Sequence, residues 1–170
     1  MKNYLNTFLI TLLFGFTAAF ADTGTRSVDT EATLSASPEA VMQAFLDEDD
    51  LKAWWKVTRA FVEPKVGGVW SITWDDWGEE KTQHAWIGVI EELEPTTLVI
   101  GHLVMIEPDM PLLAPMQIEI NVSARDRGTA LMLSHKGYGY CDHWDTMYDL
   151  VVNGWDHVLG DMETWFQETY

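Results

Sequence analysis

The chain has 170 residues, and its 27 acidic side chains outnumber its 10 basic ones, which gives a formal net charge of −17 at neutral pH. So acidic a surface repels phosphate backbones, and the sequence has no cluster of Lys and Arg, so nucleic acid is excluded as a partner. Cys141 is the single cysteine, so an intrachain disulfide is excluded too, and the fold must be stabilised by packing.

Residues 1–21 have the features of a secretory signal peptide. Lys2 supplies a positive start, an apolar run covers residues 8–16, and Ala19-Phe20-Ala21 has the small-x-small form of a signal-peptidase site. The run is short for a membrane-spanning helix, which needs about 20 apolar residues, so we expect no stable membrane anchor. We therefore predict cleavage near Ala21 and a periplasmic or secreted single domain over residues 22–170.

The predicted domain begins with one strand and two short helices. Residues 28–35 alternate loosely as a strand. Ser37-Pro38-Glu39 then supplies the cap serine, the first-position proline and the acidic first turn of a helix. After an acidic break at residues 47–50, apolar residues near Trp54 and Trp55 predict a second short helix.

The next part of the chain, residues 59–138, is typical of antiparallel strands separated by turns. The strand at 116–125 has the clearest alternation of apolar and polar side chains. Residues 107–115 hold three of the six prolines and predict a loop. The predicted strands cover residues 60–66, 69–74, 82–93, 98–105, 116–125 and 129–136.

Residues 142–167 predict one long C-terminal helix, because apolar side chains recur three or four residues apart and form one stripe. The stripe consists of Trp144, Tyr148, Val151, Trp155, Val158, Leu159, Met162 and Phe166. A sheet with one apolar face must be covered, and this helix is the longest predicted element. We therefore predict an α+β fold, in which a curved antiparallel sheet wraps around the long C-terminal helix, with the two short helices after the first strand.

Short motifs spread over residues 28–168 resemble the helix-grip superfamily that includes START domains and the birch-pollen allergen (SRPBCC). Within it the chain is most similar to the AHSA family, related to the C-terminal domain of the activator of the heat-shock protein 90 ATPase. The motifs are Ser37-Pro38-Glu39-Ala40-Val41, Trp54-Trp55, Val66-Gly67-Gly68-Val69-Trp70, Gly88-Val89-Ile90-Glu91 with Glu94-Pro95, Gly128-Thr129-Ala130-Leu131-Met132-Leu133-Ser134-His135 and Gly154-Trp155. The resemblance implies a helix-grip fold with a cavity between sheet and helix, and it carries no catalytic signature. The co-chaperone role needs a cytosolic partner and does not suit an exported chain.

Strand alternation and the face of the helix predict which side chains line such a cavity. Trp70, Trp74 and Trp86 lie on consecutive predicted strands and would form flat apolar walls, suited to an aromatic or lipid-like molecule. Ordinary core filling is the alternative interpretation. The predicted wall residues are Trp70, Trp86, His102, Ile120, Leu133, Tyr148, Val151 and Trp155.

The histidines are the candidates for chemistry. His84 and His102 lie on neighbouring predicted strands, where an imidazole facing the cavity could act as an acid or a base. His135 ends a strand near Cys141 and His143, but this spacing is weak for zinc, so we predict no metal and no cofactor. Exposed or structural histidines remain the simpler interpretation.

Three hypotheses follow. The first is an exported binding module, without catalytic residues, that holds a hydrophobic or aromatic small molecule. The second is a cyclase, dehydratase or hydrolase type of enzyme that uses His84, His102 or His135, which requires two titratable groups to converge in the pocket. The third is a protein-interaction module without a ligand in the cavity, which a large exposed apolar patch would favour.

Overall fold

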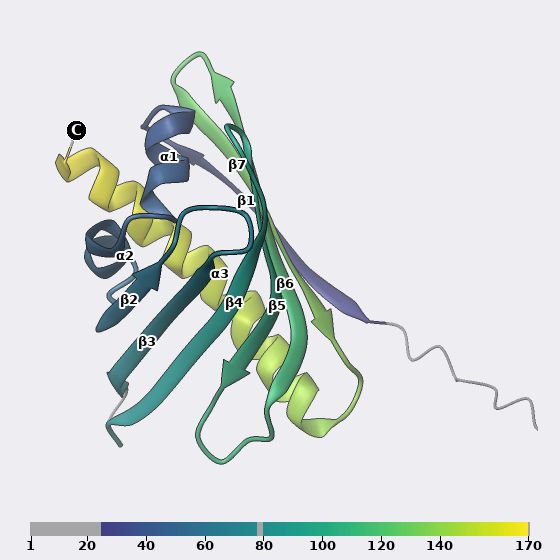
Figure 1. Cartoon of the computed structure of the whole chain (residues 1–170). Helices are drawn as coiled ribbons and strands as arrows, with labels where there is room; N and C mark the ends of the chain where they lie inside the picture. The colour runs from purple at the N-terminus through teal and green to yellow at the C-terminus, as the bar shows by residue number, and fades with distance from the viewer. Residues whose placement is uncertain (1–24, 78–79, 170) are drawn as a thin grey trace, which may run out of the picture.

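A computed structural model of the chain describes residues 25–77 and 80–169 (Figure 1). The predicted signal peptide lies outside these residues, as do Gly78 and Glu79, which belong to the turn that the polar residues 76–80 predict. The elements in chain order are β1 (Arg26–Leu34), α1 (Pro38–Ala44), α2 (Glu48–Trp54), β2 (Arg59–Val62), β3 (Val69–Trp77), β4 (Thr82–Glu94), β5 (Thr97–Ile106), β6 (Leu113–Arg125), β7 (Gly128–Tyr138) and α3 (Asp142–Thr169).

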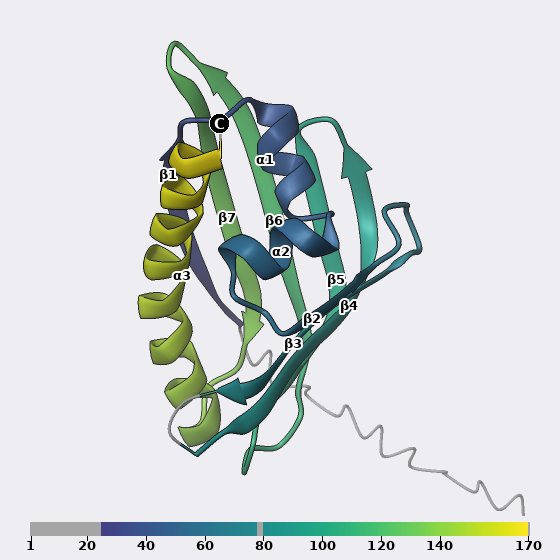
Figure 2. The same cartoon turned by 90° about the vertical axis from the view of Figure 1, so that its left-hand side faces the viewer.

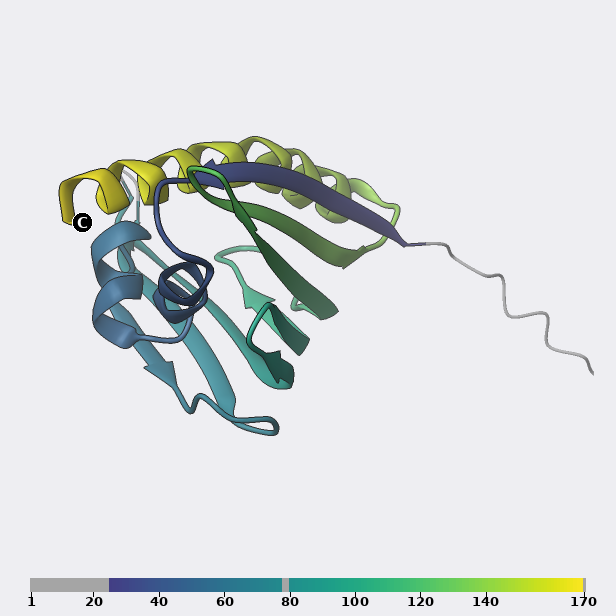
Figure 3. The same ribbon diagram turned by 90° about the horizontal axis from the view of Figure 1, so that it is seen from above.

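The seven strands form one antiparallel sheet in the order β1-β7-β6-β5-β4-β3-β2. Consecutive strands from β2 to β7 are neighbours, and β1 closes the far edge beside β7. Figure 3 shows the sheet curving around the three helices, with α3 running beside β1. The predicted α+β helix-grip fold is confirmed, and no helix among the described residues is long and apolar enough to cross a membrane.

Local capping explains where the two short helices begin. The Ser37 side chain accepts the backbone N–H of Ala40 at the start of α1, and Pro38 occupies the first helical position. The Asp47 carboxylate accepts the N–H groups of Asp49 and Asp50 at the start of α2. Figure 2 shows both helices lying against the concave face of the sheet, beside α3.

The apolar stripe of α3 is buried as predicted along most of its length. Its buried residues are Met147, Val151, Trp155, Leu159, Met162 and Phe166. Trp144, Tyr148 and Val158 of the predicted stripe are only half-buried, whereas Met147, which was not predicted, is fully buried. The contact stripe is therefore turned slightly around the helix, because α3 packs beside β1 rather than over the middle of the sheet.

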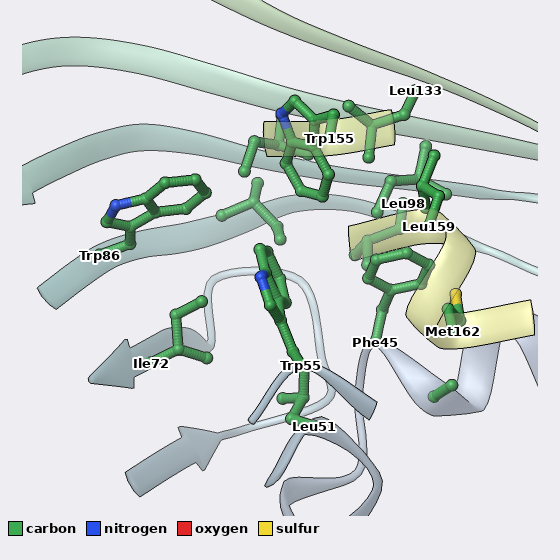
Figure 4. Close-up of a cluster of buried hydrophobic side chains, with 14 of the residues drawn as sticks. Phe45, Leu51, Trp55, Ile72, Trp86, Leu98, Leu133, Trp155, Leu159 and Met162 are labelled. Carbon is green, nitrogen blue, oxygen red and sulfur yellow. The ribbon is translucent and has the colours of Figure 1, made fainter. Parts of the chain in front are cut away.

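Tryptophan side chains connect the helices to the sheet. The indole N–H of Trp54 donates to the carbonyl of Ala44 at 2.8 Å, and that of Trp70 donates to the carbonyl of Phe45 at 2.9 Å. Both indoles are fully buried, so these bonds satisfy groups that have no access to water. Figure 4 shows side chains from α2, the sheet and α3 meeting in one core.

Strand β6 begins at Leu113, earlier than the proline-rich sequence predicts. Leu113 is fully buried and lies opposite Met105 of β5, which favours an extended backbone there. Pro115 lies where the register of β5 and β6 shifts, between the pair of Leu103 with Met116 and the pair of Met105 with Leu113. A proline is compatible with a strand at such a position, because no regular ladder bond requires its missing N–H.

Candidate functional site

A cavity of about 160 Å³ lies between α3 and strands β3, β4 and β5. Its wall residues are Trp55, Trp74, Trp77, His84, Trp86, Met105, Glu107, Met147, Leu150, Val151, Gly154, Trp155 and Val158. Trp77 and Leu150 are more than half exposed and mark the mouth, whereas Trp155 and Met147 are buried at the inner end. The pocket is therefore an apolar recess that opens to solvent beside the middle of the helix.

Five indole rings dominate the pocket wall, and they come from four parts of the chain. Trp55 follows α2, Trp74 and Trp77 lie on β3, Trp86 lies on β4 and Trp155 on α3. Figure 4 shows three of them, Trp55, Trp86 and Trp155, converging from their separate elements. This convergence exists only in the tertiary structure, because no sequence segment contains more than two of them.

The planes of three of these rings stand steeply to one another. Trp55 and Trp86 make an interplanar angle of 89°, Trp55 and Trp74 make 76°, and Trp74 and Trp86 make 75°. Edge-to-face contacts of this kind are favourable for aromatic side chains. The rings therefore support one another and form a preformed wall.

Protein acceptors lie near the N–H groups of three of the indoles. Trp86 donates to Oε1 of Glu107 at 3.3 Å, Trp74 to the carbonyl of Trp55 at 3.4 Å, and Trp155 to Nδ1 of His135 at 3.4 Å. These donors have partners inside the protein, so the wall is largely apolar toward a bound molecule.

The polar part of the pocket is a histidine–carboxylate pair. Nδ1 of His84 lies in close hydrogen-bond contact with Oε2 of Glu107, and Nε2 of His84 lies 2.8 Å from the hydroxyl of Thr82. The Glu107 side chain is only 8% exposed. Ala85 faces Ile106 in the sheet, and His84 and Glu107 are the chain neighbours of this pair, with Glu107 directly after the end of β5.

His135 lies behind the pocket wall, in ring contact with Trp86 and Trp155, and it is fully buried. Burial lowers its pKa from 6.5 to about 3, so the ring is neutral near pH 7. Its Nδ1 accepts from the Trp155 indole, and Tyr138 contributes a hydroxyl at 2.9 Å. The proton of the neutral ring therefore resides on Nε2, which has no hydrogen-bond partner among the described residues.

Three of the eight predicted wall residues, Trp86, Val151 and Trp155, line the pocket. Trp70, Ile120 and Leu133 are buried in the packed core instead. Tyr148 is half-buried, and its hydroxyl donates to the carbonyl of Ser27 at 3.2 Å, outside the pocket. Trp70, Ile120 and Leu133 face the interior as alternation predicts, but helices and neighbouring side chains fill the space in front of them.

The structure corrects the predicted orientation of His102. Its side chain is 77% exposed, and its Nε2 lies 3.3 Å from Oε1 of Glu91 on the outer face of the sheet. A register shift between Ile100 and Leu103, with a positive φ of 49° at His102, reverses the alternation within β5. Residues Met105 and Glu107 beyond the shift consequently face inward.

The sequence pattern did not predict a role for Glu107, which falls in the predicted loop at residues 107–115, or for Trp77, which falls in the polar turn expected at residues 76–80. Alternation along β4 from Trp86 back to His84 was the available signal for the histidine. No local signal marked Glu107, because its orientation depends on the shifted register of β5.

The segment with Cys141 and His143 is exposed, and the sulfur lies 3.4 Å and 3.5 Å from the two ring nitrogens of the histidine. Across residues 25–77 and 80–169, no three His, Cys, Asp or Glu side chains are grouped so as to hold a metal ion. His135 lies apart from this pair, buried against Trp86 and Trp155.

The antiparallel sheet, its long C-terminal helix and the pocket between them define a helix-grip protein. The profile of the family described as activator of Hsp90 ATPase homolog 1-like protein matches residues 35–167, and the chain belongs to this family. The predicted resemblance is thus confirmed. No curated protein matches the chain.

Solved structures show the same fold at low sequence identity. A Staphylococcus aureus protein of unknown function is 18% identical with a TM-score of 0.68, covering 86% of this chain and 96% of its own. A Mesorhizobium loti protein is 17% identical with a TM-score of 0.65, covering 85% and 99%. CalU16 from Micromonospora echinospora is 20% identical with a TM-score of 0.59, covering 84% and 76%. These similarities establish the fold alone.

Proposed function

We propose that the chain is an exported binding protein that holds a small hydrophobic or aromatic molecule in the pocket between α3 and strands β3–β5. The observation that carries this proposal is the preformed recess walled by five indoles. Small-molecule sites are typically concave and apolar, with a few polar groups that orient the ligand. The pair of His84 and Glu107 is such a polar group at the edge of an apolar recess.

The size of the pocket limits the ligand. A cavity of about 150 Å³ is enough to hold benzene, and the present cavity has about 160 Å³. Drug-sized molecules occupy cavities of about 300–1,000 Å³. The proposed ligand is therefore a molecule with one ring, or an aliphatic group of that size, and not a long acyl chain.

The absence of a side chain at Gly154 keeps part of the pocket open. This glycine lies in the middle of α3 and lines the pocket, and a Cβ added there would meet no atom within 4 Å. A glycine inside a helix costs about 1 kcal/mol relative to alanine. Gly160, in the same helix but outside the pocket wall, also faces open space. This second glycine provides a matched control.

The first experiment is native mass spectrometry of the protein purified from the compartment to which it is exported, followed by denaturing extraction. We expect an extra mass that corresponds to a small ring compound. The second experiment is titration with toluene, followed by tryptophan fluorescence. Gly154→Leu should abolish toluene binding by filling the pocket, whereas Gly160→Leu should leave it unchanged. Binding of toluene that is equal in both variants, or absent from the wild type, would contradict the proposal.

A second candidate function is acid–base catalysis on the bound molecule. It is favoured by the convergence of two titratable groups, His84 and Glu107, at the edge of the apolar pocket. A carboxylate that holds Nδ1–H orients the ring and leaves Nε2 as a base, apart from its contact with Thr82. The test compares wild type with His84→Asn for conversion of the extracted ligand, followed by mass spectrometry. Recovery of unchanged ligand from both proteins would eliminate this candidate.

A further inference from the structure

We infer that the pocket selects a small organic cation, such as a quaternary ammonium or a protonated amine, over a neutral molecule of the same shape. This inference rests on the proposed function, because it names the ligand class of the same pocket. Two features carry it together: the tryptophan walls and the carboxylate of Glu107 among them.

The charges that line the pocket favour a cation. Among the described residues of the wall, Glu107 is the carboxylate, and Lys and Arg are absent. The chain as a whole has a formal net charge of −17, which raises the local concentration of cations and repels anions. A ligand with a carboxylate or phosphate group would therefore be opposed both at long range and at the site.

The tryptophan rings of the wall also favour a cation. The faces of indole rings attract cations, and Trp is the strongest of the aromatic side chains in this respect. The planes of Trp55, Trp74 and Trp86 are close to mutually perpendicular, at 75° to 89°. Trp55, Trp74 and Trp86 border the recess together with Trp77 and Trp155, so a guest in it is surrounded by aromatic surface. Aliphatic side chains could form an equally apolar wall for a neutral molecule, but they would not attract a cation in this way.

The polar pair places a buried carboxyl group at the edge of the pocket. A neutral His84 donates from Nδ1 to Glu107 and accepts at Nε2 from the hydroxyl of Thr82, 2.8 Å away. The Glu107 side chain is 8% exposed, and the Trp86 indole is its other donor. A carboxylate buried without a countercharge is destabilising, and a cation in the pocket supplies that countercharge.

A charged His84 would satisfy the same network in another way. Its Nε2–H would donate to Thr82, whose hydroxyl then donates to the carbonyl of Trp77 at 3.2 Å. That state already neutralises Glu107, so the bound cation and a charged His84 compete for one carboxylate. Removing the ability of residue 84 to become charged should therefore not weaken cation binding.

The experiment compares choline with 3,3-dimethylbutan-1-ol, which has the same shape and no charge, by isothermal titration calorimetry. Cation–π contacts in desolvated sites contribute enough for about a tenfold difference or more, so we expect choline to bind at least about tenfold more tightly. Equal affinity, or preference for the alcohol, would overturn the inference. In that case the proposed function stands if the alcohol or toluene binds, and it fails with the inference if neither does.

Three variants test which residues of the pocket produce the preference for choline over the neutral alcohol. Glu107→Gln keeps the shape of the side chain and removes its charge, and Trp77→Leu removes an exposed ring at the mouth, where folding depends on it little. Each should weaken the binding of choline several-fold more than it weakens the binding of the neutral alcohol. His84→Asn keeps a donor near Glu107 and should bind choline at least as tightly as wild type. Loss of choline binding in His84→Asn, with none in Glu107→Gln and Trp77→Leu, would overturn the assignment.

Discussion

The indole N–H of Trp155 points at Nδ1 of His135, 3.4 Å away, and this contact joins α3 to β7 behind the pocket. The two residues are 20 positions apart in the chain. The contact sets the tautomer of His135, and burial among Trp86, Tyr138 and Trp155 keeps its ring neutral. The wall of the candidate site therefore depends on a histidine that never faces solvent.

Stability should decline on mild acidification because of His135. Its folded-state pKa is about 3 and its ordinary value is 6.5, so between these values the unfolded chain binds a proton that the native protein does not. The free energy of unfolding should be insensitive to His135 above pH 6.5 and fall below it by about 1.4 kcal/mol per pH unit. Urea denaturation at pH 7 and pH 5 measures this change.

Two variants isolate that histidine. His135→Asn keeps an acceptor for the Trp155 indole and removes the titrating ring, so its stability should lose this dependence between pH 6.5 and 5. His157 is an exposed residue of α3 and is the control. His157→Gln should keep the full dependence. An unchanged slope in His135→Asn would show that another group is responsible.

Alanine substitutions at the two glycines of α3 should separate an effect on the free energy of unfolding from an effect on ligand binding. Gly154→Ala and Gly160→Ala both place a methyl group in open space, so each should raise the free energy of unfolding by about 0.5–1 kcal/mol. Thermal or urea denaturation measures the gain. Only Gly154→Ala should weaken ligand binding, because only Gly154 lines the pocket. A destabilised Gly154→Ala would indicate that its surroundings are more crowded than the structure shows.

Trp70 should contribute to the free energy of unfolding and not to the affinity for the ligand. Trp70→Phe removes the indole N–H bond to the carbonyl of Phe45 and leaves a small cavity in a fully buried site. We expect a loss of about 2–4 kcal/mol in the free energy of unfolding, measured by urea denaturation. Trp77→Phe, at an exposed ring, should change it by about 0.5 kcal/mol or less. A large effect of Trp70→Phe on ligand affinity, in protein that is still folded, would indicate that Trp70 contributes to the pocket wall after all.

Export should be visible as a change in mass. Expressed with its N-terminal residues in a Gram-negative host, the protein should be recovered from the periplasm with Asp22 as its first residue. Intact-mass measurement of the fractionated protein tests this. Ala19→Arg disrupts the small-x-small pattern and should cause the unprocessed chain to accumulate. Processing that is unaffected by this change, or protein retained in the cytoplasm, would contradict the proposed export.

Local sequence patterns were sufficient for most of the fold. Ser37 and Asp47 cap the two short helices through their own side chains, and alternation in residues 116–125 placed β6. The stripe through Val151 and Trp155 identified α3. These features depend on residues within a few positions of one another, which is why the sequence by itself determined the elements, their order and the class of fold.

The candidate site was decided by the tertiary structure. His84 and Glu107 meet because β4 pairs with β5, and the register shift near His102 turns that histidine outward and Glu107 inward. Trp70 and Trp86 both lie on inward-facing strand positions, but only Trp86 borders empty space. Alternation determines the face of the sheet on which a side chain lies. Whether that side chain meets a cavity depends on how completely α2, α3 and their tryptophans fill the concave face, and only packing in three dimensions determines that.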